Sequence, residues 1–368
     1  MKALRFIKKN VVLLIAALAA LVTCLLVPPD KEYLRYFDWK TLSCLFLTLA
    51  VVCALRNIKF FTILARKLVT LAGNLRSLFL LLITITFIGS MVIANDMALI
   101  TFLPLGYFAL SVTKKDKYMA YLFVLQNISA NLGGMLTPFG NPQNLYLYSY
   151  FNIPTGEFCL ILLPAFLLAV ALLVISCLPI KPIKFELDDD FNEKLNIKKA
   201  VLYGVLFLMS ILIVFRVIPF IFGLAVIPFI LFMVDKDSLK MVDYPLLFTF
   251  FFFFIFAGNL ARLDSVNSLV SALLEKDTLI VSVLSCQAIS NVPSAILLSK
   301  FTNNYPALLL GVNIGGTGTL IASLASLITF NEFRLLHPEQ TKKYLLIFGA
   351  LNAAFLIILT TATKLFWL

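Results

Sequence analysis

The segment Asn131 to Asn144, NLGGMLTPFGNPQN, is too polar and too rich in glycine and proline for the apolar sequence on either side of it. Its glycines and prolines remove side-chain packing or backbone donors, and so interrupt the hydrogen-bond ladder of a helix. The interruption falls about where the middle of a bilayer-spanning helix should be. A break at that depth persists only where protein or a water-filled cavity satisfies the freed backbone groups. The segment therefore predicts a binding site inside a membrane.

The composition agrees with that environment. Hydrophobic residues make up 61% of the chain and charged residues 13%, against about 45–50% and about 25% in soluble domains. The formal net charge of +11 comes from short basic clusters between apolar runs, a pattern typical of cytoplasmic loops. We therefore expect an all-α polytopic membrane protein that contacts the lipid bilayer and does not bind nucleic acid.

Apolar runs of spanning length predict helices at about 10–27, 39–55, 158–179, 199–215, 217–234, 244–261 and 344–365. Segments 118–148 and 304–330 predict two broken helices, and segments 77–112 and 264–302 predict two hairpins with polar tips. Two arms of about 15 residues are short for a hydrocarbon core about 30 Å thick, so we favour re-entrant hairpins over full crossings. In all we expect about nine spanning helices, two re-entrant hairpins and two broken helices.

The two halves of the chain resemble each other in the same order. Asp38-Trp39 corresponds to Asp243-Tyr244, Asn95 corresponds to Asn291, and the segment 131–137 corresponds to 313–319. We expect an N-terminal repeat over 1–180, a cytoplasmic linker over 181–198 and a C-terminal repeat over 199–368. If the N-terminus is cytoplasmic, most basic residues lie on the cytoplasmic side of the membrane. The two repeats then cross the membrane in opposite directions. Polar breaks at matching places in inverted repeats are typical of secondary transporters.

We expect the two tips and the two breaks to meet near the bilayer midplane. Half-helix N-termini there would offer N–H groups to an anion, and unwound carbonyls would offer oxygen ligands to a cation. The candidate binding residues are Asn95, Asp96, Asn131, Thr137, Pro138, Gly140, Asn141, Asn144, Ser290, Asn291, Asn313, Gly315, Gly316, Thr317 and Thr319. Na⁺ is expected near Asn95, Gly140 and Asn291. The alternative for the glycine pairs is close helix packing.

Asp96 is the one acidic residue deep in an apolar segment. Such a carboxylate is by default a proton relay, an ion ligand or a paired group, so we expect it to couple transport to Na⁺ or H⁺. The alternative is a capping role at the hairpin tip. No second buried acid is expected to pair with it. His337, the only histidine, lies in a charged loop, so we expect neither an enzyme nor a cofactor beyond the coupling ion.

Several motifs resemble those of known transporters. TPFGNPQNL after NLGG is similar to the TPxGxPxN signature of the divalent-anion/sodium symporter and citrate transporter families, while IANDMALITFLPL and GVNIGGTGTLIASLASL resemble segments of arsenite permeases. The resemblance covers nearly the whole chain. It implies a scaffold with a mobile transport domain that works as an elevator, commonly as a homodimer. The tips depart from the symporters' Ser-Asn-Thr triplet at Ala94-Asn95-Asp96 and at Ser290-Asn291-Val292.

These observations predict a secondary active transporter that moves a small anion, either a carboxylate or an inorganic oxyanion, across the cytoplasmic membrane with Na⁺ or H⁺. A cation/proton antiporter is the alternative within transport. A non-transporting membrane receptor or scaffold is the alternative from another class.

Overall fold

The computed structural model describes residues 10–184 and 194–367. These residues form helices and no strand beyond an isolated bridge between Asn74 and Lys184. The α-helices are α2 (Val11–Leu26), α3 (Trp39–Asn57), α4 (Phe60–Val69), α5 (Leu75–Ile93), α6 (Asn95–Val112), α7 (Met119–Gly133), α8 (Pro142–Tyr150), α9 (Thr155–Cys177), α10 (Ile197–Val214), α11 (Phe220–Val234), α12 (Lys236–Lys240), α13 (Tyr244–Ala261), α14 (Asp264–Ile289), α15 (Asn291–Leu298), α16 (Tyr305–Ile314), α17 (Leu324–Leu336) and α18 (Thr341–Phe366). Short 3₁₀ turns are η1 (Lys31–Arg35), η2 (Asp116–Tyr118), η3 (Gly134–Leu136) and η4 (Pro338–Gln340).

Seven helical segments of the described chain are long and apolar enough to cross a membrane. They are Trp39–Asn57, Leu75–Ile93, Asn95–Val112, Thr155–Cys177, Ile197–Val214, Tyr244–Ala261 and Pro338–Phe366. Val11–Leu26, Phe220–Val234 and Tyr305–Ile314 are shorter apolar helices. The prediction of an all-α polytopic membrane protein is confirmed.

The expected length of the first hairpin's arms is wrong. Its arms, α5 and α6, have 19 and 18 residues, so each is about 27–29 Å long at about 1.5 Å per residue. The reason is that the polar tip interrupts the helix at Ala94 alone, with helix resuming at Asn95. In the second hairpin α14 bends at Asp277 before it reaches the tip, and α15 has only 8 residues, or about 12 Å.

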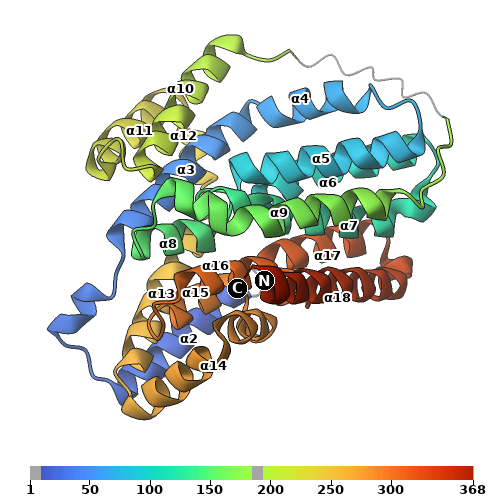
Figure 1. The fold of residues 1–368 in the computed structure, drawn as a ribbon. Helices are drawn as coiled ribbons and strands as arrows, with labels where there is room; N and C mark the ends of the chain where they lie inside the picture. The colour runs from blue at the N-terminus through green and yellow to red at the C-terminus, as the bar shows by residue number, and fades with distance from the viewer. Residues whose placement is uncertain (1–9, 185–193, 368) are drawn as a thin grey trace.

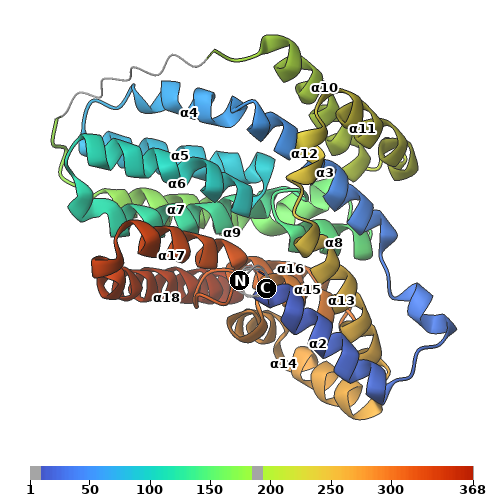
Figure 2. The same cartoon turned by 180° about the vertical axis from the view of Figure 1, so that it is seen from behind.

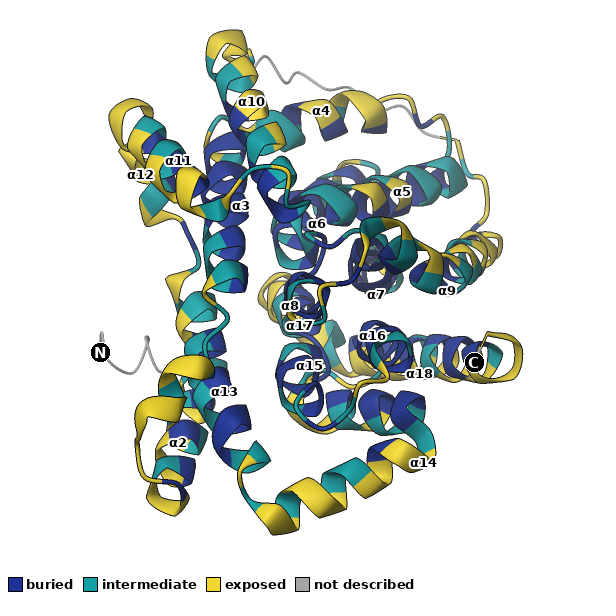
Figure 3. Cartoon of the chain, turned by 60° about the vertical axis from the view of Figure 1, so that its left-hand side comes forward, coloured by how far each residue is buried: buried dark blue, intermediate teal, exposed yellow. Residues whose placement is uncertain are grey.

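The helices pack into two groups (Figure 3). The small bundle consists of α2, α3, α10, α11, α12 and α13, in which α13 packs on α2 and α3 packs on α10, α11 and α12. The large bundle consists of α5 to α9 and α14 to α18, and Figures 1 and 2 show α5, α6, α7, α9, α17 and α18 running side by side. The two bundles meet where α3 packs on α8 and α13 packs on α15.

The backbone repeats itself at the tips and at the breaks. Ala94 and Ser290, the residues that join the arms of the two hairpins, have φ values of +67° and +75° and ψ values of +153° and +157°. Asn141 and Ser323, which precede the helices after the two breaks, both have extended backbone. The chain thus builds the same two local structures twice. The division at the linker 181–198 stays a prediction, and residues 185–193 lie outside the described residues.

Candidate functional site

Each hairpin tip is attached to the helix break of its own half. The backbone N–H of Asn95 donates to the Gly140 carbonyl at 3.2 Å, and that of Asn291 donates to the Ala322 carbonyl at 2.9 Å. Each of these asparagines also accepts, through Oδ1, the backbone N–H of the following residue at 2.9 Å. The backbone bonds of the two asparagines therefore hold each tip against the break of its own half.

A buried amide side chain joins the first tip to both halves of the chain. Oδ1 of Asn131 accepts from Nδ2 of Asn95 at 3.2 Å and from the Ser323 hydroxyl at 2.8 Å. Asn131 is on the first broken helix, whereas Ser323 ends the second break, so one oxygen connects elements from the two halves.

A second group of amides makes the same connection beside it. Asn141 donates through Nδ2 to Oδ1 of Asn313 at 3.3 Å, and Asn313 donates through Nδ2 to Oδ1 of Asn144 at 2.6 Å. All three side chains are no more than 1% exposed. The structure thus brings together the asparagines that the sequence analysis selected from both breaks.

The freed carbonyls of the first break are satisfied from within the protein. Nδ2 of Asn144 donates to the carbonyls of Gly134, Met135 and Thr137 at 2.9–3.3 Å. Pro138 is buried in the same break, and the Thr137 hydroxyl donates to the Met91 carbonyl.

Gln287 fills the same role in the second break. Its Nε2 donates to the carbonyls of Gly315 and Thr317 at 2.8 and 3.1 Å, and its Oε1 accepts the Thr319 N–H at 2.8 Å. Gly316 packs beside Nδ2 of Asn291. Three expected ligands of the second break, Gly315, Thr317 and Thr319, therefore bind Gln287, and none of them lines the cavity described below.

A cavity of about 300 Å³ lies between the two bundles. On the side of the large bundle it is lined by the first residues of four helices: α6, α8, α15 and α17. The expected site residues Asn95, Asp96, Ser290 and Asn291 line it, and so does Ser323. Helices α2 and α13 form the opposite wall. Four helix N-termini therefore point their positive dipole ends at one space.

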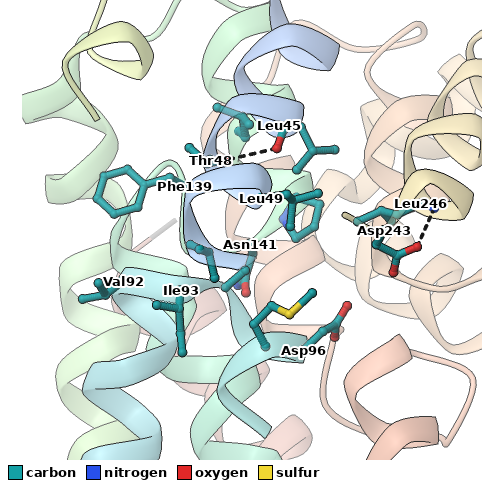
Figure 4. Close-up of a pocket in the computed structure, with 15 residues that line it drawn as sticks. Leu45, Thr48, Leu49, Val92, Ile93, Asp96, Phe139, Asn141, Asp243 and Leu246 are labelled. Carbon is teal, nitrogen blue, oxygen red and sulfur yellow. Dashed lines mark hydrogen bonds between the residues drawn. The ribbon is translucent and has the colours of Figure 1, made fainter. Parts of the chain in front are cut away.

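Two carboxylates share this region: the half-buried Asp243 lies near Asp96, where the sequence analysis expected no second buried acid to pair with it. Asp243 lines the 300 Å³ cavity together with Asp96, and both line a narrower adjoining pocket with Asn141 (Figure 4). Asp243 caps α13 by accepting the Leu246 N–H at 3.0 Å. In the sequence it looked like an ordinary capping acid at the end of a span, because only the folded chain brings the start of α13 to the cavity that Asp96 lines.

Gln143 is a further residue that sequence reasoning missed. Its side chain is 1% exposed, lines the cavity, and has an Oε1 atom without a hydrogen-bond partner in the described structure. Its place in the polar segment 131–144, next to Pro142, was a signal that could have identified it. Ser323 and Gln287 carried a weaker signal, because each is one polar residue among many in its segment.

Comparisons with known proteins agree with this architecture. An uncharacterized transporter of Methanocaldococcus jannaschii is 32% identical over 358 residues, covering 96% of this chain and 97% of that protein. Inner membrane protein YbiR of Escherichia coli is 27% identical over 310 residues, or 81% of each chain. Silicon efflux transporter LSI3 of Oryza sativa is 31% identical over 144 residues, covering 38% of this chain and 29% of that protein. The family model described as citrate transporter matches residues 3–312, and the chain therefore belongs to the citrate transporter family of membrane proteins.

Proposed function

We propose that the protein is a secondary active transporter that moves a small anion, a carboxylate or an inorganic oxyanion, across the cytoplasmic membrane together with Na⁺ or H⁺. The observation that carries the proposal is the convergence of four helix N-termini on the cavity between the bundles. Partial positive charge at helix N-termini favours bound anions without any basic side chain in the site.

The two carboxylates explain why an anion needs a coupling cation. With Asp96 and Asp243 both ionised, the cavity would repel an anion that the helix N-termini attract. A cation bound at Asp96 removes part of that repulsion, so anion and cation bind best together. Co-transport follows from this mutual dependence, because each ligand raises the affinity of the site for the other.

Flux into liposomes tests the proposal. Purified protein is reconstituted, and labelled citrate, phosphate and sulfate are offered as probes under imposed H⁺ or Na⁺ gradients. We expect uptake of at least one probe to depend on one gradient, and we expect Asp96→Asn to abolish or uncouple that uptake without loss of folded protein. Absence of flux for every probe and gradient, or wild-type coupling in Asp96→Asn, would contradict the proposal.

A cation/proton antiporter is the second candidate, and the presence of two carboxylates with no basic side chain among the described residues that line the cavity favours it specifically. In the same liposomes it would exchange Na⁺ for H⁺ with no anion present. A non-transporting receptor would bind a probe without flux.

The wider arrangement belongs to the same proposal. We place the N-terminus on the cytoplasmic side, take the large bundle as the mobile transport domain of an elevator, and expect a homodimer held by the small bundle. The division into two bundles with a cavity between them supports the elevator assignment. Cross-linking of the protein in native membranes would test the dimer.

A further inference from the structure

We propose that Asp243 is the second half of the coupling site, and that Asp96 and Asp243 hold one proton between them across the boundary of the two bundles. The inference rests on the proposed function, which it deepens by naming the coupling ion and a residue on the small bundle that helps to bind it.

The two carboxylates come from different bundles. Asp96 is the second residue of α6, at the tip of the first hairpin, and Asp243 precedes the first turn of α13. Both side chains are half-buried and line the same cavity and the same narrow pocket (Figure 4). Two carboxylates that share one partly enclosed space are not both ionised at low cost, and one shared proton removes their repulsion.

The acceptors around the pair lack donors. Oδ1 of Asp96 is buried and has no hydrogen-bond partner in the described structure. Oε1 of Gln143, which belongs to a side chain 1% exposed and lines the cavity, is also without a partner, whereas the unpartnered Oδ1 of Asn141 packs against Gly134 of the break. Unsatisfied buried acceptors are costly. A proton on one carboxyl group converts an acceptor into the donor that this set of oxygens lacks.

The surrounding oxygens favour H⁺ over Na⁺. The carbonyls of Gly140 and Ala322, which lie at the two tips, already accept backbone N–H groups from Asn95 and Asn291. A proton needs only the two carboxylates.

Among the described residues, the other charged and titratable groups near the pair come from α3. Nη1 of Arg56 lies 3.8 Å from Sδ of Met97, the residue after Asp96, and Cys53 is on the same helix, three positions before Arg56. Arg56 makes no ion pair with a described residue. The positive charge of Arg56 favours the ionised form of both carboxylates and therefore weakens proton binding by the pair. It does not neutralise them through an ion pair. The residues of α2, α8, α15 and α17 that line the cavity are uncharged.

The two halves of the chain differ at this point. Asp38 caps α3 through the Thr41 N–H at 2.9 Å, as Asp243 caps α13. However, the second tip has Val292 in the place that Asp96 occupies in the first tip. The inverted counterpart of the Asp96–Asp243 pair would therefore contain one acid only. A movement that separates the bundles would break the pair and release its proton on one side of the membrane only.

Infrared spectroscopy of the full-length protein in detergent tests the proposal without any substrate. A protonated carboxyl group has a carbonyl absorption that an ionised carboxylate lacks. We expect the wild-type protein to keep this absorption at neutral pH, and we expect Asp96→Asn and Asp243→Asn each to lose it. Asp38→Asn is the matched control and should keep it. Asparagine still caps a helix, so the substitutions at 38 and 243 preserve the first turns of α3 and α13, and thermal unfolding confirms that each variant is folded.

Three results would overturn the proposal. The first is the same absorption at neutral pH in Asp243→Asn as in the wild type. The second is the absence of this absorption from the folded wild type, and the third is its loss when Na⁺ is added at constant pH, which would assign the pair to Na⁺. Because proton binding is measured without a transported solute, a protein that moves none of the liposome probes could still confirm the pair. Conversely, a protein that transports a probe could lack the shared proton between Asp96 and Asp243.

Discussion

At the scale of single residues, amide side chains keep the interrupted helices intact. Asn144 donates to carbonyls at three positions of the first break, where a continuous helix would have supplied backbone N–H groups. Its Oδ1 in turn accepts from Asn313 of the other half. One residue therefore supports both the local break and the contact between the halves.

Replacing Asn144 with leucine should destabilise the protein. The change keeps the approximate size of the side chain but removes the donor to the buried carbonyls of the break, and it leaves Nδ2 of Asn313 with its bond to the Leu309 carbonyl alone, at a cost of about 1–3 kcal/mol. The unfolding midpoint, measured by heating the purified protein, should fall. Asn331→Leu is the control: Asn331 is exposed and accepts only a 3.3 Å bond from Arg334, so its midpoint should stay close to that of the wild type. Equal midpoints for both variants would contradict this role of Asn144.

The same residues show what the sequence could and could not reveal. Asn131, Asn141 and Asn313 were predictable because asparagine beside glycine in an apolar segment has no packing explanation. Asp243 was not, because its signature is that of any acidic helix cap. Its neighbour Asp96 lies 147 positions away in the chain, and no local pattern records which helix start packs against a hairpin tip.

At the scale of elements, glycines set how closely the helices approach, so the packing explanation for them holds beside the functional one. A Cβ atom at Gly133, the last residue of α7, would meet the Phe87 carbonyl oxygen and the Ser90 hydroxyl of α5. In the second half, a Cβ atom at Gly311 of α16 would meet Ser282 of α14. In both halves a broken helix thus packs directly against one arm of the hairpin.

Alanine at Gly133 should therefore separate α7 from α5. Backbone atoms of α5 cannot rotate away as a side chain can, so we expect a loss of about 1–3 kcal/mol in the free energy of unfolding. Gly349→Ala in α18 is the matched control, because nothing lies within 4 Å of the added Cβ. There the better helix propensity of alanine should leave stability unchanged or raise it by up to about 1 kcal/mol. Thermal unfolding of both variants measures the difference, and a Gly133→Ala protein as stable as Gly349→Ala would refute the close contact.

The arms of the hairpins show the limit of sequence reasoning at this scale. The polar tip was placed correctly at Asn95, but its extent was overestimated, because Asn95 and Asp96 are themselves the first residues of α6. Polar residues at a helix start and in a loop look alike in sequence. Likewise, the bend at Asp277 has no proline or glycine to announce it. It became visible only from the non-helical backbone at that residue, whose side chain caps the following turn through the Ile280 N–H at 3.0 Å.

At the scale of the whole molecule, the two bundles touch through a limited set of contacts beyond the cavity. Nη2 of Arg216, in the turn between α10 and α11, donates to the Tyr148 carbonyl of α8 at 2.7 Å, and its guanidinium lies 4.3 Å from the centroid of the Tyr148 ring. The rings of Phe139 and Phe215 meet across the same boundary at 5.9 Å between centroids. If the large bundle moves as a body, these contacts must break during each transport cycle, whereas contacts inside that bundle must persist.

Cross-linking distinguishes moving contacts from persistent ones. We expect a cysteine pair at 139 and 215, joined by a short bifunctional maleimide, to lose liposome flux on cross-linking, since the pair would fix the large bundle to the small one. A pair at Phe87 and Phe166, whose rings lie 5.0 Å apart on α5 and α9 inside the large bundle, should keep its flux when cross-linked. Each pair is compared with its own protein before cross-linking, in a background whose six natural cysteines are replaced by alanine.

A second boundary pair is needed because Phe139 also lines the narrow pocket beside Asp96. A cross-link at position 139 therefore alters that pocket as well as tethering the bundles. Tyr146 of α8 and Phe254 of α13 meet across the boundary at 5.6 Å between ring centroids. Cross-linking them should arrest flux in the same way, because a tether at any point of the boundary prevents rigid-body displacement. Full flux with both boundary pairs joined would show that the bundles do not move past one another, and the elevator would have to be replaced by a smaller movement confined to the hairpin tips.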